Sequence, residues 1–509
     1  MFRQPGSQPQ QPGGHIITLH KKVLRLLAII VLIGPLLYCG KDAVKSTPDI
    51  DPVHFKSAAE LARAIQRREI TSIDLLNGYL DRIQRYNEDI NAVVALDITA
   101  ARRRAAAADK ALAQGKNWGP LHGVPMTVKD VFEVVGMPAT SGDPVLKGYI
   151  PKRNALAVQR LIDAGAIIFG KTNVPYHAMD IQSYNQIYGT TNNPWDLSRT
   201  PGGSSGGSAA ALAAGFTPLE LGSDIGGSVR FPAHYTGVFG HKPTFGIVPR
   251  YGHIPPMPGS VSQHVMPTIP LFVVGPLARS ADDLELALGV LTTPGNREVS
   301  DSRPELLPPR RQQFKNYRVA VWFTDSDPAA EIDTDVLATL EKTVEKLRAA
   351  GLDIDEEARP IIDLLEDRRI WLEIYNQMTA GALPLDERLA GRQKKQQARW
   401  AEFFERYDVL MAPVAPTVAF PHDHKGTLLT RSFKINGQEK PMLNSMTWTY
   451  MAIVSGLPAT VAPVGLSDSG LPVGIQIIGA RFEDRTTIAF ARGLSELTGG
   501  FIAPPGFED

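Results

Sequence analysis

Residues 201–233 read PGGSSGGSAAALAAGFTPLELGSDIGGSVRFPA and contain two segments rich in Gly and Ser, 202–208 and 222–233. A flexible linker of this composition would lie between polar segments and separate two domains. Here the first segment instead runs directly into AAALAAG, which is typical of a closely packed helix of small residues. Glycine allows the backbone to approach a neighbouring group closely. The stretch therefore predicts two loops that meet at a buried site.

The second loop carries the residue types that acyl transfer requires. Cleavage of an amide needs a nucleophile, a base that takes its proton, and backbone donors that stabilise the oxyanion. Glycines in the sequence DIGGS allow successive N–H groups to turn toward one point, and Ser228 follows them as the candidate nucleophile. Each well-placed donor contributes about 3 kcal/mol to transition-state stabilisation. The candidate donors are the N–H groups of Ile225, Gly226, Gly227 and Ser228.

The base is not an obvious histidine. His234 and His241 lie nearby but fit no recognised triad order, and the G-x-S-x-G elbow of α/β-hydrolases is absent. Lys129, in the apolar segment VPMTVKDVF, is the alternative. Burial disfavours its charge and can supply the loss of about 3 units from its free pKa of about 10.4. Considered alone, the position of Lys129 favours a plain pairing with Asp130 at the end of a strand over a role as base.

Three elements together resemble the amidase signature family of serine hydrolases. They are the lysine-bearing strand GVPMTVKDV, the first serine of GGSSGG and the serine of DIGGSVR. Their spacing agrees as well, with 75 residues from Lys129 to Ser204 and 24 from Ser204 to Ser228. GKTN, SGLPATVAPVG and LPVGIQIIG also look like family segments. The resemblance spans roughly residues 55–500.

The resemblance implies a Ser–cis-Ser–Lys triad that works without a cofactor. Ser228 would be acylated, Ser204 would follow a cis peptide bond and relay the proton, and Lys129 would be the base. Three further residues would support the loops through hydrogen bonds, namely Ser205, Asp224 and Arg230. The implied activity is hydrolysis of a small-molecule carboxylic amide to a carboxylate and ammonia or an amine.

One segment departs from the family pattern. Many members carry Glu two residues after GKTNx, where this chain has Tyr176 in NVPYHAMD. We expect this loop to line the acyl pocket, so substrate specificity does not transfer from the family. The predicted pocket residues are Tyr176, Ala178 and Met179.

Two other patterns suggest ligands that we do not expect. Gly165–Thr172, GAIIFGKT, matches the phosphate-loop pattern, but its inner residues favour a core strand that ends in a turn. His422 and His424 lie in a charged loop, which is more typical of surface residues than of metal ligands. We therefore predict neither a nucleotide site nor a metal site.

The rest of the chain predicts an α/β fold with a large mixed sheet covered by helices on both faces. Short apolar runs alternate with helical patterns, among them expected helices at 56–67 and 72–86. A single amidase domain is expected over 50–500, with a signature core at about 120–250 and a helical middle at about 300–405. A linker is expected at 294–313.

Composition narrows the function classes. Among 509 residues, Lys and Arg total 53 and so do Asp and Glu, so no basic surface for nucleic acid is indicated. The single Cys excludes a disulfide framework and a multi-cysteine metal site.

The N-terminal segment 1–45 differs from the rest of the chain. Basic residues precede an apolar run, Leu26–Tyr38, which is too short to span a membrane but suits the core of a signal peptide. Cys39 follows as a candidate lipidation site, although Tyr38 before it departs from the lipoprotein pattern. A cleaved signal or a signal anchor are the alternatives. Each would make the protein exported or associated with the membrane of a bacterial cell envelope through residues 20–39.

Two other functions stay open at this point. The chain could be the catalytic subunit of a tRNA-dependent amidotransferase, which the exported character of the N-terminus disfavours. It could also be a non-catalytic envelope protein on the same fold, which the three filled catalytic positions disfavour. A homodimer is a further expectation.

Overall fold

The computed structural model describes residues 53–258, 271–293, 306–379 and 385–508. All of them belong to one compact unit, Ile50–Asp509. The predicted signal core Leu26–Tyr38, with Cys39, lies outside the described residues, as does most of the predicted linker. Among the described helices, none is long and apolar enough to cross a membrane.

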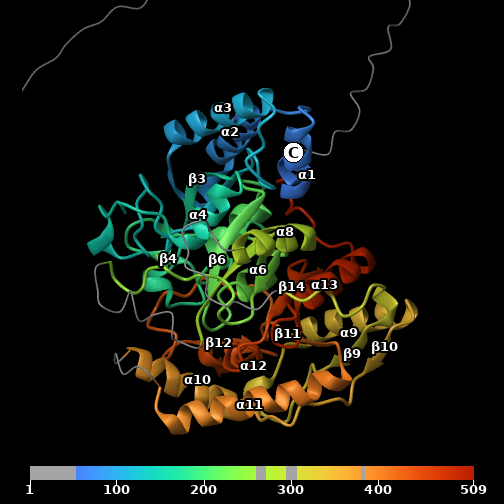
Figure 1. Ribbon diagram of the computed structural model, residues 1–509. Helices are drawn as coiled ribbons and strands as arrows, with labels where there is room; N and C mark the ends of the chain where they lie inside the picture. The colour runs from blue at the N-terminus through green and yellow to red at the C-terminus, as the bar shows by residue number, and fades with distance from the viewer. Residues whose placement is uncertain (1–52, 259–270, 294–305, 380–384, 509) are drawn as a thin grey trace, which may run out of the picture. The chain divides into compact units, whose positions relative to one another are not determined.

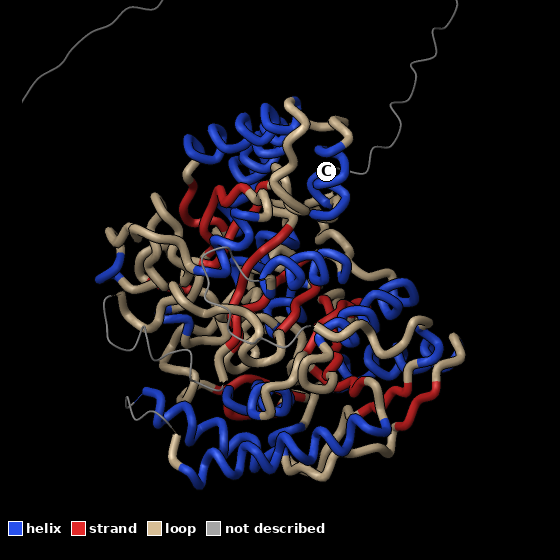
Figure 2. The backbone as a smooth tube through the Cα atoms, in the orientation of Figure 1, coloured by secondary structure: helices blue, strands red, loops and turns tan. Residues whose placement is uncertain are grey.

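A mixed eight-stranded sheet forms the centre of this unit (Figures 1 and 2). Strands β10, β9 and β11 run parallel to one another, and every other neighbouring pair is antiparallel. In spatial order the strands are β10 (Asp353–Asp355), β9 (Arg318–Val321), β11 (Val409–Pro413), β15 (Pro472–Ile478), β14 (Ala459–Leu466), β7 (Phe239–Lys242), β8 (Val273–Ala278) and β6 (Leu219–Asp224).

Helices cover both faces of this sheet. Side chains along a strand alternate between its faces, so the contacts of neighbouring positions show what covers each face. On β15, the Gln476 side chain bonds with Arg230 at the start of α6 (Arg230–Thr236) and with the carbonyl of Trp448 in α12 (Thr447–Val454). On the neighbouring β14, Thr460 contacts Thr487 of α13 (Asp484–Thr498) instead. The predicted α/β class, with a mixed sheet between helices, is confirmed.

A second sheet contains three strands in the order β1 (Val93–Leu96), β3 (Ile167–Thr172) and β2 (Pro125–Lys129). The expected helices at 56–67 and 72–86 are α1 (Ala58–Gln66) and α2 (Ser72–Ile90). Helix α2 continues past the expected end and stops where Asn91 adopts the left-handed conformation. Helix α3 (Ile98–Ala113) packs against α2 beside this sheet (Figure 1), and α4 (Leu156–Asp163) precedes β3.

The two sheets meet where β2 lies against β6. The backbone N–H of Thr127 donates to Thr217 Oγ1 at 3.1 Å, and the Thr127 hydroxyl donates to the Glu220 carboxylate. One apolar cluster includes Val128 of β2 and Leu221 of β6, so the two sheets share a core. Helix α5 (Gly206–Ala213), the predicted small-residue helix, is buried along its whole length beside this junction.

The remaining elements surround the sheets. The predicted helical middle contains α9 (Thr334–Ala349), α10 (Leu364–Thr379) and α11 (Glu387–Arg406), and Figure 1 shows α10 and α11 side by side. Helix α8 is Ala281–Thr292, and two short hairpins pair β4 (Tyr184–Asn185) with β5 (Gly189–Thr190) and β12 (Ser432–Ile435) with β13 (Gln438–Pro441).

Candidate active site

Lys129 ends strand β2 with a fully buried side chain. Its Nζ is 2.7 Å from Ser204 Oγ and 3.1 Å from Ser223 Oγ. The alternative in which Lys129 pairs with Asp130 is wrong, because Asp130 Oδ1 is 3.2 Å from the Nζ of Lys171. Consecutive residues leave a strand on opposite faces, so Lys129 and Asp130 meet different partners.

The environment of Lys129 favours the neutral amine. Burial lowers its pKa to about 7, and the negative charges of Asp224 and Glu220 oppose that shift. An ordinary lysine, with a pKa of about 10.4, is almost entirely protonated at neutral pH. Lys129 therefore has the protonation equilibrium that a general base near pH 7 requires.

Ser204 lies in the first Gly/Ser-rich loop, just before helix α5. The peptide bond between Gly203 and Ser204 is cis, in agreement with the family resemblance. The next residue joins the two loops, because the Ser205 N–H donates to the carbonyl oxygen of Ser228 at 3.2 Å. Its hydroxyl is 3.5 Å from the Ser223 carbonyl. Segments around residues 129, 204 and 228 are thus brought together.

Ser228 is half-buried and lies between β6 and α6, in a loop that Asp224 organises. The Asp224 carboxylate accepts hydrogen bonds from the Gly227 N–H at 2.7 Å, the Val229 N–H at 3.2 Å and the Arg230 guanidinium. Gly227 has a φ of 121°, and a Cβ there would lie 2.4 Å from the Phe231 ring. Only glycine fits this turn.

The four N–H groups predicted as oxyanion donors differ in their hydrogen bonding. The Gly227 N–H is occupied by Asp224, so it is not available to a ligand. The N–H groups of Ile225, Gly226 and Ser228 donate to no acceptor within the described part of the chain. Three of the four predicted donors therefore remain available.

Two residues that sequence reasoning missed hold the peptide planes of this loop. Trp371 Nε1 on α10 donates to the Ile225 carbonyl at 2.7 Å, and the Thr449 hydroxyl on α12 donates to the Gly226 carbonyl at 2.8 Å. In a trans peptide the carbonyl and the following N–H point in opposite directions. Fixing the Ile225 carbonyl therefore fixes the direction of the Gly226 N–H. No local sequence pattern marks these two residues, because they lie 146 and 223 positions along the chain from the carbonyls that they contact.

The predicted pocket residues form a short turn, η3 (Tyr176–Ala178), followed by Met179. Tyr176 is 52% exposed and Met179 is 51% exposed. The turn is held by His177, whose Nε2 is 2.7 Å from Asp143 Oδ2. None of the described hydrogen bonds or ring contacts joins Tyr176, Ala178 or Met179 to the triad, so their place in the acyl pocket stays a prediction.

The phosphate-loop match is a strand. Residues 167–172 form β3, and the Lys171 side chain is fully buried within the protein. Its Nζ donates to the carbonyls of Phe132 at 2.7 Å and Pro138 at 3.1 Å, besides its pairing with Asp130. The ammonium group of this lysine is already surrounded by three acceptors within the protein, so it is not placed to bind a phosphate.

None of the described hydrogen bonds or ring contacts joins the two histidines of the charged loop to the predicted triad. His424 stacks on the Tyr184 ring with the centroids 3.8 Å apart, and the His422 ring is 5.5 Å from that of His424. Across the described ranges, no group of three or more His, Cys, Asp or Glu side chains is placed to hold a metal ion.

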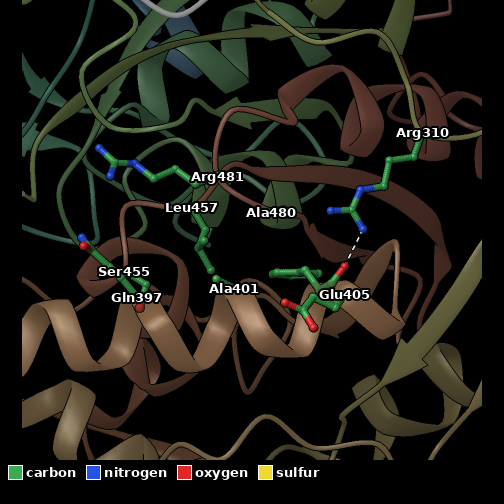
Figure 3. A pocket seen from close by; sticks show the side chains of 9 residues that line it. Arg310, Gln397, Ala401, Glu405, Ser455, Leu457, Ala480 and Arg481 are labelled. Carbon is green, nitrogen blue, oxygen red and sulfur yellow. Dashed lines mark hydrogen bonds between the residues drawn. The ribbon is translucent and has the colours of Figure 1, made fainter.

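A separate cavity of about 270 Å³ lies between α11 and the loops that flank β14 and β15 (Figure 3). Arg310 reaches across one end, where its Nη1 donates to the Phe404 carbonyl at 2.6 Å, and Arg481 lines the other. None of the predicted catalytic residues lines this cavity.

Comparison with known proteins gives a consistent result. A family model described as Amidase matches residues 74–383 and 368–488. Human fatty-acid amide hydrolase 2 is 33% identical, over 94% of this chain and 95% of the relative. A glutamyl-tRNA(Gln) amidotransferase subunit of Anaeromyxobacter sp. (strain K) is also 33% identical, over 88% of this chain and 97% of the relative. Among solved structures, 6-aminohexanoate cyclic dimer hydrolase superposes with a TM-score of 0.71 at 26% identity, covering 90% of this chain and 100% of that one.

Proposed function

Because this chain belongs to the Amidase family of amide hydrolases, we propose that it hydrolyses a carboxylic amide through an acyl-enzyme on Ser228. One observation carries the assignment of roles, namely the fully buried Lys129 amine 2.7 Å from Ser204 Oγ. The hydrogen bond between the Ser205 N–H and the Ser228 carbonyl supports it, because it joins the loop that carries Ser204 to the loop that carries Ser228.

In the proposed acylation, neutral Lys129 takes the proton of Ser204 while Ser204 takes that of Ser228. Ser228 Oγ then bonds to the amide carbonyl carbon, and the carbonyl oxygen becomes an oxyanion. The N–H groups of Ile225, Gly226 and Ser228 are the donors that would stabilise it. Collapse of this intermediate breaks the C–N bond, and the leaving nitrogen receives the proton from Lys129 through Ser204.

Deacylation follows the same path. Water gives its proton toward Ser204 and Lys129 while its oxygen attacks the acyl carbon, and the departing Ser228 oxygen takes a proton back. The products are a carboxylic acid and ammonia or an amine, and every proton passes through Ser204 and Lys129 on its way from water or Ser228 to the leaving group. The neutral amine of Lys129 is restored after each turnover.

Treatment of the full chain with a fluorophosphonate probe, followed by intact-mass analysis, tests this mechanism. We expect one adduct on the wild type and none on Ser228→Ala. Lys129→Ala should label more slowly by about 10²- to 10⁴-fold, because general-base catalysis is worth that much. Ser469→Ala, which removes an exposed serine, is the matched control and should label like the wild type. A folded wild type without an adduct would instead favour the non-catalytic protein.

A second candidate is the catalytic subunit of an amidotransferase, because a relative of that name is as similar in identity as the hydrolase. The two functions differ in what they require. The proposed hydrolase should release carboxylate from simple amides as a single chain. A requirement for a partner chain and ATP would favour the amidotransferase. The assay compares product release by the purified chain with and without ATP and the other amidotransferase chains of a bacterial host.

We further propose that the protein is attached to, or exported through, a bacterial cell membrane. Residues 20–39 support this through their basic cluster, apolar run and Cys39. Labelling of the full chain with radioactive palmitate in a bacterial host tests it, with Cys39→Ser as the control. Label that depends on Cys39 supports the lipoprotein, and an unlabelled membrane form supports the signal anchor. An unlabelled, full-length protein in the cytoplasmic fraction would contradict the proposal.

A further inference from the structure

Lys129 has a second hydroxyl partner beside Ser204. Ser223 lies on β6, is 3% exposed, and places its Oγ 3.1 Å from the Lys129 Nζ. A neutral primary amine has two N–H bonds and one lone pair. Whether Lys129 can deprotonate Ser204 therefore depends on where its lone pair points, and a partner that accepts one N–H restricts that direction.

His253 determines the direction of the Ser223 hydroxyl. The Nδ1 of His253 is 3.0 Å from the carbonyl oxygen of Pro255, which can only accept, so Nδ1 carries a proton. Burial, with smaller contributions from Lys129 and Arg250, lowers the pKa of His253 to about 3, so the ring is neutral at physiological pH. Its Nε2 is then an acceptor, 3.0 Å from Ser223 Oγ.

The surroundings hold this ring in place. His253 meets Phe132 and Phe272 in edge-on contacts, with centroids 5.3 Å and 4.4 Å away. Arg250 lies over the Phe272 ring and donates to the Phe272 carbonyl at 2.9 Å. The Ser223 hydroxyl therefore meets a fixed acceptor on one side and the Lys129 amine on the other.

We propose that Ser223 and His253 form a positioning pair that accepts one N–H of neutral Lys129 and thereby directs its lone pair to the Ser204 hydroxyl. Ser223 has one proton, which it donates to His253 Nε2. Its oxygen can then only accept an N–H from Lys129, so Ser223 does not compete for the lone pair of the amine, which is kept for the Ser204 hydroxyl. The inference rests on the proposed function, in which Lys129 is the base.

The pH dependence of kcat/KM for a chromogenic amide tests the pair in the full chain. In His253→Leu the Ser223 hydroxyl loses its acceptor and can donate to the lone pair of Lys129, in competition with Ser204. We expect the plateau at high pH to fall about 10- to 100-fold, the usual loss for one hydrogen bond to a buried group. The midpoint should also move to lower pH. In the wild type the Ser223 oxygen accepts an N–H of Lys129 and so stabilises the protonated amine, and the variant loses this stabilisation.

A double-mutant cycle separates positioning from a general structural effect. Ser223→Ala should lower the plateau and the midpoint in the same directions. Since His253 acts only through Ser223, the double variant Ser223→Ala/His253→Leu should be no slower than Ser223→Ala alone. Ser223→Thr keeps the hydroxyl and should retain most of the plateau. Additive losses, or an unchanged midpoint in both single variants, would overturn the proposal.

His122→Leu is the matched control. This variant also removes a buried imidazole with two hydrogen bonds, to the Trp118 N–H and the Ala108 carbonyl, and neither contact involves the triad. It should leave the midpoint of the pH profile unchanged. Charges that face Lys129 belong to Asp224 and Glu220 on β6, and the variants of the pair retain both.

Neutron diffraction of the deuterated wild type provides a test that depends on no variant. We expect deuterium on Nδ1 of His253 and none on Nε2. Deuterium on Nε2 would overturn the proposal, because Ser223 would then be free to donate to Lys129. Fluorophosphonate labelling of Ser228 in the wild type distinguishes this failure from failure of the proposed function, which would leave the wild type unlabelled.

Discussion

Burial gives Lys129 its proposed role. The side chain is enclosed between two serine hydroxyls. The negative charges of Asp224 and Glu220 offset only part of the free-energy cost of burying a charged amine. A lysine in water would hold its proton throughout the physiological range. The same burial leaves Asp130, the next residue, dependent on Lys171 for its counter-charge. The end of β2 thus carries Lys129, whose site favours the neutral amine, and next to it Asp130, which forms an ion pair with Lys171.

This environment predicts how the rate depends on pH. Only the neutral amine can accept a proton, so kcat/KM should rise with pH through a midpoint near 7 and level off above it. In Lys129→Ala the rate should fall by about 10²- to 10⁴-fold and the rise should disappear. The measurement is kcat/KM of both proteins from about pH 5.5 to 9.5, a range that brackets the midpoint. A rise of the same size in Lys129→Ala would remove this residue from the mechanism.

At the scale of elements, helix α5 brings Ser204 to Lys129 through backbone contact. A Cβ at Gly207 would lie 2.4 Å from the backbone nitrogen of Asn173, directly after β3, and the Gly207 N–H donates to the Asn173 carbonyl at 3.3 Å. Helices α10 and α12 hold the loop before Ser228 through hydrogen bonds that Trp371 and Thr449 donate to its carbonyls. Small residues and distant helices therefore fix two loops that are irregular in themselves.

Alanine substitution in two helices tests this close packing. Gly207→Ala should lower the free energy of unfolding by roughly 1–3 kcal/mol, because the added methyl group overlaps the Asn173 backbone. Gly289→Ala is the matched control in α8, where a Cβ meets nothing within 4 Å. It should raise the free energy by about 0.5–1 kcal/mol through helix propensity. Urea unfolding measures the free energy of unfolding of both variants. If Gly207→Ala were as stable as Gly289→Ala, the prediction would be contradicted.

At the scale of the whole molecule, the proposed catalytic residues lie where the three-stranded sheet meets the eight-stranded sheet. Strand β2 supplies Lys129, and β6 leads into Ser228. The eight-stranded sheet also buries Lys242 at the end of β7, whose Nζ donates to the Pro243 carbonyl at 3.0 Å. Burial is the main cause that lowers the pKa of Lys242 to about 7, and the positive charge of Arg230 adds to it.

The buried Lys242 predicts how stability varies with pH. Between pH 7 and about 10.5 the unfolded chain binds a proton at this residue that the folded chain releases, so stability rises with pH across that window. Lys242→Met removes this contribution. The variant should be more stable than the wild type by roughly 2–4 kcal/mol at pH 7, with little advantage at pH 10.

Urea unfolding at both pH values measures the effect. The exposed Lys342, substituted as Lys342→Met, is the control and should show no such dependence on pH. A Lys242→Met advantage that is equal at pH 7 and pH 10 would show that the folded chain does not release this proton.

Local pattern was sufficient for the elements and for the candidate triad. Apolar periodicity marked α1 and α2 within a few residues, and the alternation of strands and helices indicated an α/β fold. The spacing of Lys129, Ser204 and Ser228 carried the family resemblance, because these residues lie in short segments whose glycines and apolar neighbours are visible in sequence. The inner residues of the phosphate-loop match likewise indicated a strand, which is β3.

Only the tertiary structure decided which groups these residues contact. Sequence left Asp130 as a partner for Lys129 and counted the Gly227 N–H among the oxyanion donors, whereas the folded chain gives Asp130 to Lys171 and Gly227 to Asp224. It also brings Trp371 and His253 to the site from distant segments. The physical reason is that propensity and periodicity act over a few residues. Hydrogen-bond partners across the junction of two sheets depend on how the whole chain is threaded.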